Sequence, residues 1–507
     1  MPELILTLDA GTTGLKCSVF TREGAVVGAC TAAYGVNYYG EGKAEQTAEQ
    51  FYAAAVQAVR QLLPAFDPKA VTVIGLSGTM NGCLPVDEEG SALYPNMIHA
   101  DTRAAAEVEE IRSVIDDETY YARTANRPAV NYTLPKLLWL RKHEPQVYGK
   151  IRTVLNTKDA IYGFLTGNFR RTDYSDASLT GMFRIAEGQW DTELLRELDI
   201  RCDILPEIVP SHNTEGRLAK KAAELLGLPA GIPVSMGAGD GSCATHGAGV
   251  ALPGEAYCNV GSSAWLAMLA DHPAQDPERR VFSFADMDGV HFNICGTVQC
   301  GAAAFDWAAE KLLLGHKPEK ADFAMLEKAA MEAPVGSRGI FFLPTLMGER
   351  TPWWTPDAKG TLIGMTPGHD RKEVIRAVYE GVVQALHQCG AVMEENGLRY
   401  RSLSLIGGGA SSGVWPRMFA DAFGLPVTLP AEPRAATSLG AAAAAGVGAG
   451  LYASYAEAAS FVTKKAELTP DMEKYSAYQD HFEVYRSLYG RICSAYEVIS
   501  RYQERHV

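Results

Sequence analysis

Several features that mark common protein classes are missing from this chain. No two of its ten cysteines are two residues apart, so the usual zinc and redox spacings are absent. No tract is both long and strongly apolar, because residues 439–453 are mostly Ala and Gly and predict a buried helix instead of a membrane span. No positive segment precedes the short apolar run at the start, so a signal peptide is not predicted. We therefore expect a cytoplasmic protein without disulfides.

Positive charge is also scarce. The 507 residues include 46 Lys and Arg against 60 Asp and Glu, a formal net charge of −14, with no run of five or more like charges. This balance argues against a nucleic-acid backbone as the main partner, since that partner requires clustered cations. With 47% hydrophobic and 21% charged residues, the composition is typical of a folded protein. We expect small-molecule ligands, with no nucleic acid and no membrane as partners.

Four well-known catalytic or nucleotide-binding patterns do not occur. There is no G-x-x-x-x-G-K-[ST], no H-E-x-x-H, and no G-x-G-x-x-G, because the glycine after Gly407 and Gly409 comes one residue late, at Gly413. The tract Gly75–Thr79 lacks the last glycine of a G-x-S-x-G elbow. P-loop, zinc-protease, dinucleotide-binding and serine-hydrolase chemistry are therefore not supported.

Isolated histidines and tryptophans carry weaker signals. His99 and His246 have no metal-ligand spacing, so core or surface roles are expected for both. Trp353 and Trp354 stand between two prolines, which favours a packed loop between domains over an aromatic lid.

What the chain does contain is an internal repeat. An apolar strand at 4–8 enters the small-residue turn Asp9–Gly14 and returns at 17–20, and the same device recurs at 255–269 around Gly261. The two copies are 250 residues apart, which predicts two similar domains, 1–250 and 251–507. Helical patterns between the strands predict an α/β fold, and they cover residues 47–63, 104–115 and 371–393.

A second pair of glycine-rich loops follows later strands, at 237–241 and at 407–411. If these two loops are equivalent, the first half contains about 80 additional residues before its loop. Insertions of this kind supply ligand contacts at strand ends, so we expect the acceptor pocket to lie in the first half.

The loops also carry candidate chemistry. Backbone N–H groups in the turn Asp9–Gly14 can form an anion site for a polyphosphate, with Asp9 holding Mg²⁺, although one copy alone is also compatible with an ordinary hairpin. Asp240 follows a strand between two glycines, where it can act as a general base or simply cap a helix. The loop 407–411 can accommodate a flat adenine or ribose, or form a tight turn.

Six motifs in order resemble those of the FGGY carbohydrate kinases over essentially the whole chain. These are Asp9–Lys16, Gly75–Gly82, Asn131–Lys136 with Trp139, Gly237–Gly241, Tyr379–Val382 and Gly407–Ala410. The resemblance implies two duplicated ribonuclease H-like domains around a central cleft, as in actin, hexokinase and the Hsp70 ATPase. It also implies that the cofactors are ATP and Mg²⁺ and that the reaction is phosphoryl transfer to a sugar hydroxyl.

Carried onto matching positions, the resemblance assigns roles to individual residues. Asp240 is the expected catalytic base, and Asp9 and Asp240 are the expected metal ligands. The expected ATP-binding residues are Asp9, Gly11, Thr12, Thr13, Lys16, Gly261, Ser262, Gly301, Gly408, Gly409, Ala410 and Ser412. The expected sugar-binding residues are Met80, Asn81, Asp101, Arg103, Asp240 and Gly241. The N-terminal domain would bind the sugar with the first phosphate loop, and the C-terminal domain would supply the second loop and the adenosine pocket.

The acceptor is less sharply defined. Within the family the chain is most similar to xylulose kinases, but Asn81 stands where they have His, and Gly241 replaces a longer polar residue. D-Xylulose is the expected acceptor, and another ketose or a polyol such as ribulose, rhamnulose or erythritol is the alternative. An actin- or Hsp70-like ATPase and a non-catalytic sugar-binding regulator are further alternatives. A homodimer is left open.

Overall fold

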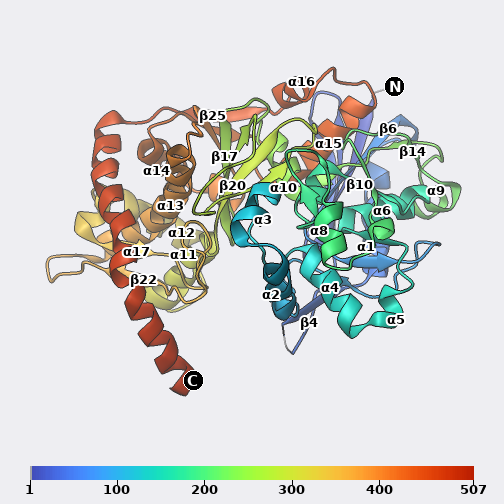
Figure 1. The fold of residues 1–507 in the computed structure, drawn as a ribbon. Helices are drawn as coiled ribbons and strands as arrows, with labels where there is room; N and C mark the ends of the chain where they lie inside the picture. Colours follow the sequence, from blue (N-terminus) through green and yellow to red (C-terminus); the bar gives the residue numbers. More distant parts are fainter. Residues whose placement is uncertain (1–2, 41, 507) are drawn as a thin grey trace.

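A computed structural model describes residues 3–40 and 42–506, which form two lobes on either side of a central region (Figure 1). Each lobe is built on a seven-stranded sheet. The first sheet has the order β14 (Gly216–Arg217), β15 (Pro233–Val234), β6 (Val71–Gly78), β1 (Leu4–Ala10), β2 (Gly14–Thr21) and β3 (Val26–Ala33), with β16 (Ala238–Gly239) also paired to β6. The second has the order β19 (Phe282–Ala285), β20 (Phe292–Val298), β18 (Ala264–Ala270), β17 (Glu255–Val260), β23 (Ser402–Ile406), β24 (Val427–Pro430) and β25 (Lys464–Leu468).

The two sheets share one topology. β1 pairs antiparallel with β2 and parallel with β6, and β17 pairs in the same way with β18 and β23. The next neighbours also match, since β2 with β3 and β18 with β20 are antiparallel, while β6 with β15 and β23 with β24 are parallel. The repeat predicted from the sequence is therefore a repeat of the whole sheet, and the duplicated α/β fold is confirmed.

The topology corrects one expectation. Because β23 matches β6, the loop at 407–411 is equivalent to the segment after Gly78 and not to the loop at 237–241. The first lobe does contain a long insertion, residues 79–232 between β6 and β15, but the second lobe has its own, residues 299–401 between β20 and β23. The comparison of loop spacings was wrong because it paired loops that follow different strands.

Helices pack against both sheets. The predicted helices form α1 (Ala48–Leu62), α2 (Ala105–Val114) and α13 (Arg371–Glu395). In α13 the backbone N–H of Asp370 donates to the Glu373 carboxylate at 2.8 Å, a capping contact that fixes the first turn. α1 buries Phe51, Ala55 and Leu62 at helical spacing in the core of the first lobe.

The insertions contain most of the remaining elements. The other helices are α3 (Asp117–Thr124), α4 (Thr133–His143), α5 (Pro145–Tyr148), α6 (Thr157–Thr166), α7 (Tyr174–Ser178), α8 (Thr192–Glu197), α9 (Lys220–Leu226), α11 (Ala302–Ala308), α12 (Lys320–Glu332), α14 (Trp415–Phe423), α16 (Tyr455–Ser460) and α17 (Met472–His506). The short strands are β4 (Asn37–Tyr39), β5 (Lys43–Gln46), β7 (Leu84–Val86), β8 (Asn96–Met97), β9 (Thr153–Leu155), β10 (Arg171–Asp173), β11 (Phe183–Arg184), β12 (Gln189–Trp190), β13 (Glu207–Val209), β21 (Phe341–Leu343) and β22 (Thr361–Ile363).

Two helices of small residues, α10 (Asp240–Gly247) and α15 (Ala436–Gly448), lie together between the lobes (Figure 1). A Cβ on Gly247 would come within 1.7 Å of the Ala436 carbonyl oxygen, and one on Gly440 within 1.9 Å of the Cys243 carbonyl oxygen. Larger side chains would separate the two backbones, so glycine is required at this crossing. The buried helix predicted in the Ala- and Gly-rich tract is confirmed, although it begins earlier, at Ala436, and ends at Gly448.

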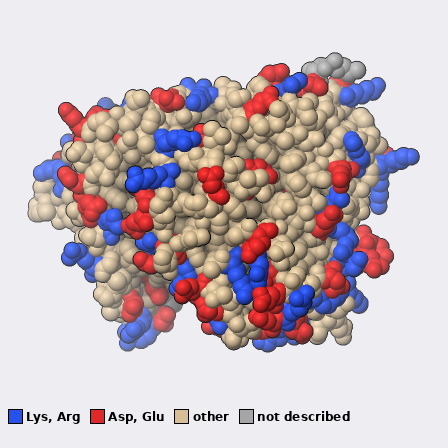
Figure 2. All heavy atoms as spheres, turned by 45° about the horizontal axis from the view of Figure 1, so that its top comes forward, with Lys and Arg blue, Asp and Glu red and all other residues tan. Residues whose placement is uncertain are grey.

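The charge distribution on the surface and the polarity of the helices agree with the expectations from the amino-acid composition. Acidic and basic side chains are interspersed over the face drawn in Figure 2, without a large basic patch on that face. Within residues 3–40 and 42–506, no helix combines the length and apolar character needed to span a bilayer.

Candidate active site

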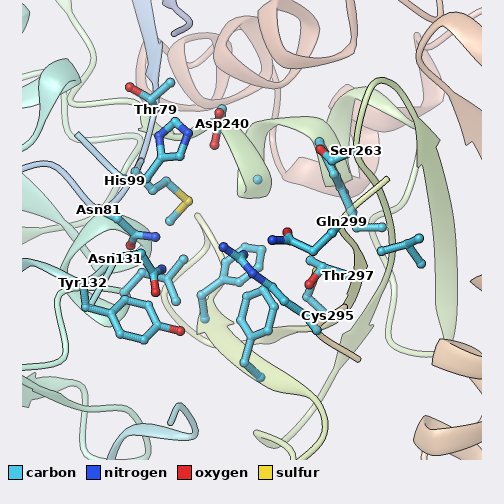
Figure 3. A pocket seen from close by; sticks show the side chains of 18 of the residues that line it. Thr79, Asn81, His99, Asn131, Tyr132, Asp240, Ser263, Cys295, Thr297 and Gln299 are labelled. Atoms are coloured by element: carbon cyan, nitrogen blue, oxygen red, sulfur yellow. The ribbon is translucent and has the colours of Figure 1, made fainter. Parts of the chain in front are cut away.

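A cavity of about 340 Å³ opens between the lobes (Figure 3). Residues from both halves line it, so the cavity is not confined to the first half, where we expected the acceptor pocket. The lining residues are Thr12, Thr79, Met80, Asn81, His99, Asn131, Tyr132, Leu179, Asp240, Gly241, Ser263, Ala264, Trp265, Phe282, Phe284, Cys295, Thr297, Val298, Gln299, Arg350 and Trp354.

The sheet brings Asp9 and Asp240 to the same edge. β1 and β16 both flank β6, with Asp9 and Ala238 in register with Ser77, and Asp240 follows β16 directly as the first residue of α10. Burial raises the pKa of Asp240 to about 7, and the nearby charge of Asp9 adds to this shift. A carboxyl group with this pKa is suited to take up a proton near neutral pH.

Buried polar contacts hold α10 in position. His246 Nε2 lies 2.7 Å from Asp286 Oδ2, and Ser242 Oγ donates to Asp286 Oδ1 at 2.9 Å. Before the helix, the Gly239 N–H donates to Ser175 Oγ at 2.9 Å. The core role expected for His246 is confirmed, because its ring is 2% exposed and forms an ion pair that ties α10 to the second lobe.

The first hairpin loop is built to present N–H groups. The Gly11 N–H donates to the Gly14 carbonyl at 3.0 Å, and the Gly11 carbonyl accepts from the Tyr34 hydroxyl. Gln46 Nε2 donates to the Thr12 carbonyl at 2.8 Å. Among the residues that the structure describes, none accepts a hydrogen bond from the N–H of Thr12 or Thr13. With its carbonyls held from behind, the loop can bind an anion at its free N–H groups.

The second hairpin loop is joined to the start of α11. The Gly261 N–H donates to the Ser263 carbonyl at 3.0 Å, and the Gly301 N–H donates to the Ser262 carbonyl at 2.8 Å. A Cβ on Gly301 would lie 2.6 Å from the Ala264 Cβ, so only glycine fits at this contact. Gly261, Ser262 and Gly301 thus form one compact turn, and Ser263 reaches the cavity.

The loop after β23 packs on the second hairpin. A Cβ on Gly409 would lie 2.6 Å from the Val260 side chain, and Ala410 is 7% exposed. Gly408 is exposed, and the nearest atom to a Cβ there is 3.9 Å away. Ser412 Oγ donates to the Glu327 carboxylate at 2.8 Å, which anchors the end of the loop. The loop is a 3₁₀ turn over Gly408–Ser411 that buries Gly409 and Ala410 and leaves Gly408 exposed beside the second hairpin.

Residues 433–437 connect the loop after β23 to the first hairpin. The Pro433 carbonyl accepts from the Gly407 N–H at 3.1 Å, the Arg434 carbonyl accepts from Lys16 Nζ, and Thr437 Oγ1 donates to the Asp9 carboxylate. No local pattern predicts the contacts to Lys16 and Asp9, because these two partners lie more than 400 residues away in the first lobe.

On the opposite side of the cavity, the structure separates the expected sugar-binding residues into two groups. Met80, Asn81 and Gly241 line the cavity. Asp101 and Arg103 do not, and this corrects the expectation for them. The Arg103 guanidinium lies 2.6 Å from both the Asp101 and the Glu45 carboxylates, in a network where the Asp101 side chain is fully buried. Buried charges pair with one another, which leaves neither group free for a ligand.

Other cavity residues were missed by the sequence analysis. His99, which we expected in the core or on the surface, lines the cavity two residues before Asp101. Burial, with further contributions from Lys136 and Arg350, lowers the pKa of His99 to about 4, so its ring is neutral. Trp354 also lines the cavity, while Trp353 stacks on Tyr489 with ring centroids 4.1 Å apart.

Lys136 organises the wall of the cavity from behind. Its buried Nζ donates to the carbonyl oxygens of Asn81 at 2.6 Å, Ile98 at 2.8 Å and Asn131 at 2.7 Å. These three residues belong to three separate segments, each of which contributes a lining side chain (Figure 3). Burial lowers the pKa of Lys136 to about 7.

Comparisons with known proteins agree with this geometry. Residues 4–247 match the N-terminal domain of the FGGY family of carbohydrate kinases, and residues 256–449 match its C-terminal domain. A xylulose kinase of Escherichia coli is 30% identical over 489 residues, which are 96% of this chain and 99% of the relative. A gluconokinase of Bacillus subtilis is 27% identical over 514 residues, 99% of each chain. The crystal structure of a ligand-bound xylulose kinase from Lactobacillus acidophilus superposes with a TM-score of 0.91 at 26% identity, covering 98% of this chain and 100% of the other.

The fold and the site together define an ATP-using phosphotransferase of the actin- and hexokinase-like ATPase fold that acts on a sugar hydroxyl. This class accounts for the main features of the structure: two duplicated sheets, two similar hairpin loops, and a carboxylate at the edge of the cavity between the lobes. The chain belongs to the FGGY family of carbohydrate kinases.

Proposed function

We propose that this kinase transfers the γ-phosphoryl group of ATP to a hydroxyl of a ketose, with D-xylulose as the expected acceptor. The observation that carries the proposal is Asp240, which lines one cavity together with the expected sugar-side residues Met80 and Asn81 and the loop residues Thr12 and Ser263. The 28–30% identity with xylulose kinases over 96% of this chain supports the choice of sugar.

The reaction follows from the placement of these groups. Asp240 accepts the proton of the acceptor hydroxyl as its oxygen attacks the γ-phosphorus, and the pKa of about 7 suits that transfer. The N–H groups of the two hairpin loops stabilise the charge on the transferred group. Because phosphoryl transfer has a loose transition state, alignment of the two substrates is expected to contribute more than base strength.

Mg²⁺ fits the donor set at this edge. Asp9 and Asp240 are two carboxylates near one another and near free loop N–H groups, and Mg²⁺ commonly uses one or two carboxylates with waters and phosphate oxygens. Bound there, the ion would neutralise charge on the phosphates. Asp9 would hold it with Asp240 beside it.

The remaining assignments complete the proposal. ATP would bind with its phosphates between Gly11–Thr13 and Gly261–Ser262, assisted by Gly301. Lys16, on β2, would lie beside the phosphates, while Gly408–Ala410 and Ser412 would adjoin the adenosine. The domain 1–250 would supply the base and the first phosphate loop, and the domain 251–507 the second loop and the adenosine pocket. We expect the enzyme to work in the cytoplasm.

A coupled assay of ADP release tests the proposal across ketoses and polyols. Release stimulated by D-xylulose, and more weakly by ribulose, rhamnulose or erythritol, would support it. ATP hydrolysis that no sugar stimulates would instead favour a chaperone-like ATPase. Sugar binding without turnover would favour a regulator that has lost catalysis.

A further inference from the structure

A cluster of four buried charged side chains, Lys158, Asp159, Asp173 and Asp176, lies beside the strand that leads to Asp240. Lys158 Nζ lies 2.7 Å from Asp159 Oδ1, 2.9 Å from Asp173 Oδ1 and 3.1 Å from Asp176 Oδ2, and all four side chains are at most 1% exposed. Against the effect of burial, the three carboxylates raise the pKa of Lys158, so its ammonium group stays charged. Apolar packing in place of such a cluster is often as stable or more stable, so stability alone does not account for it.

The cluster adjoins the point where β16 pairs with β6. Gly239 of β16 is in register with Gly78 of β6, and a Cβ on Gly78 would lie 3.0 Å from Lys158 Cβ. β16 has only two residues, Ala238 and Gly239, and a ladder of two residues supplies few hydrogen bonds. Other groups must therefore fix the backbone from which Asp240 projects.

Ser175 joins the cluster to this backbone. Its Oγ donates to Asp173 Oδ2 at 2.6 Å and accepts from the Gly239 N–H at 2.9 Å. A serine hydroxyl has one proton, and a carboxylate paired with an ammonium group only accepts hydrogen bonds, so the Ser175 proton points to Asp173 and its lone pairs face Gly239. Lys158 holds the other oxygen of Asp173, which keeps that carboxylate from rotating. The three side chains on this path, Lys158, Asp173 and Ser175, are fully buried.

The Asp240 carboxylate has little support of its own. A hydrogen bond from the adjacent Gly241 N–H acts on it, and no other side chain among the residues that the structure describes donates to it. The backbone on both sides of the base is held instead. Gly239 is held by Ser175, and the Gly241 carbonyl accepts from the Tyr257 hydroxyl at 3.2 Å. The Ser175 contact is the shorter of the two and is the one that the charged cluster supports.

We propose that Ser175 is a positioning residue for phosphoryl transfer. Its hydroxyl, oriented by Asp173, holds the Gly239 N–H. This contact sets the direction in which the following residue, Asp240, enters the cavity. The inference rests on the proposed kinase function and adds to it a determinant of turnover at the same site. Ser175 does not line the cavity, so it acts on the reaction only through the backbone next to the base.

The physical basis is the rigidity of the path and the strict geometry of the reaction. A buried polar network in which every member is paired is rigid. Phosphoryl transfer depends mainly on alignment, and a displacement of about 1 Å can lower the rate by about 100-fold. Loss of the Ser175 contact would leave the Gly239 N–H without its acceptor and allow the base to move.

Two buried serines separate this role from a general contribution to folding. Ser175 and Ser211 both donate to Asp173 Oδ2, at 2.6 Å and 2.8 Å, and both side chains are fully buried. Of the two hydroxyls, only that of Ser175 also accepts from Gly239. Ser211→Ala is therefore the matched control for Ser175→Ala.

Steady-state kinetics by ADP release measure the effect, with ATP and the acceptor that the sugar screen favours. We expect kcat to fall about 30-fold in Ser175→Ala, because the base loses its alignment, with KM for ATP within about 3-fold of the parent value. In Ser211→Ala, kcat should stay within about 3-fold of the parent value. Ser175→Cys, whose sulfur is a weak acceptor, should have a kcat between those of the parent and Ser175→Ala.

The results distinguish the inference from the proposed function. If the parent phosphorylates a sugar but Ser175→Ala keeps its kcat, or Ser211→Ala loses as much, the inference is wrong and the kinase proposal stands. A rise in KM for ATP as large as the fall in kcat would also overturn the inference, because a general disturbance of the site would explain both. If no sugar stimulates ADP release in the parent enzyme, both proposals are wrong.

A second pair of variants covers the case in which Ser175→Ala does not fold. Ser175→Cys and Ser211→Cys then give the same comparison with a smaller change in volume. A fall in kcat of about 10-fold in Ser175→Cys alone would support the inference, and equal kcat values in the two variants would overturn it.

Discussion

The two halves of this kinase have the same hairpin with different side chains. The loop Asp9–Gly14 of the first half aligns with Asn259–Ala264 of the second, and both close through a glycine N–H, that of Gly11 or of Gly261. At the start of the loop, however, the first half has a carboxylate, Asp9, and the second has an amide, Asn259. Both halves therefore have the same hairpin backbone, but only the first half has a negatively charged side chain at the start of the loop.

The segments after the equivalent strands β6 and β23 differ in a similar way. In the first half, Thr79, Met80 and Asn81 project side chains into the cavity. In the second, Gly408–Ala410 offer backbone and almost no side chain. Duplication of the fold thus supplied two similar hairpins, and the division that we propose between acceptor chemistry and nucleotide binding depends on a few side chains in one copy.

The largest expected effect comes from Asp240, which has no counterpart in the second half. Asp240→Asn keeps the volume but removes the proton acceptor, so kcat should fall by about 10³- to 10⁴-fold while KM for ATP stays within about 3-fold. Steady-state kinetics by ADP release measure both constants. Asp203→Asn, exposed on the surface, is the control. Parent-like turnover in Asp240→Asn would remove the base assignment.

Exchanging the residue at the start of the first loop tests the asymmetry directly. Asp9→Asn gives the first hairpin the residue of the second, and we expect kcat/KM for ATP to fall by about 10²- to 10³-fold, because charge stabilisation at the phosphates is lost. Asn259→Ala, at the equivalent position, should change kcat/KM by less than about 3-fold. Equal losses in the two variants would mean that the halves share the metal-binding role.

The pH dependence provides a third test. The pKa of Asp240 is raised to about 7, so the carboxyl becomes protonated, and inactive as a base, as the pH falls through that value. We expect kcat/KM for the sugar to fall about tenfold per pH unit below 7, or roughly 100-fold by pH 5, and to level off above 8. The pH profile of the parent enzyme measures this. A profile that is flat between pH 5 and 8 would contradict it.

The smallest effect should come from Lys136, which acts on the sugar side only. Lys136→Met preserves length and apolar character but leaves three carbonyl oxygens without their donor, so the segments of Asn81, Ile98 and Asn131 should loosen. We expect KM for the sugar to rise about 10-fold, with KM for ATP nearly unchanged. Lys220→Met, exposed at the start of α9, is the control. An equal rise in both KM values would indicate a general loss of structure.

Sequence reasoning succeeded for features that depend on the local conformation of the backbone. The strands of both hairpins, the glycine turns between them and the helices α1, α2 and α13 lie close to their predicted positions, because strand and helix periodicities and glycine turns are local properties. The loop residues Thr12 and Asp240 reach one cavity as the motif order implied.

Sequence reasoning failed for residues that contact one another in the fold but lie far apart in the sequence. His99, Arg350 and Trp354 come from two insertions and meet only at the cavity, so no local pattern distinguishes them from core residues. Asp101 and Arg103 matched the family motif, yet a carboxylate from β5, Glu45, completes a buried network around them. The pairing of loops 237–241 and 407–411 failed because strand order within a sheet does not follow chain order.

The sequence by itself determined that there are two similar halves, each with a small-residue hairpin, and an acidic residue after a later strand. These features follow from local sterics and periodicity, which neighbouring residues decide among themselves. The tertiary structure alone decided which side chains share the cavity and which charges are already paired. Pairing of buried charges depends on desolvation and on contacts between distant segments, and it enclosed Arg103 with Asp101 and Glu45 away from the cavity.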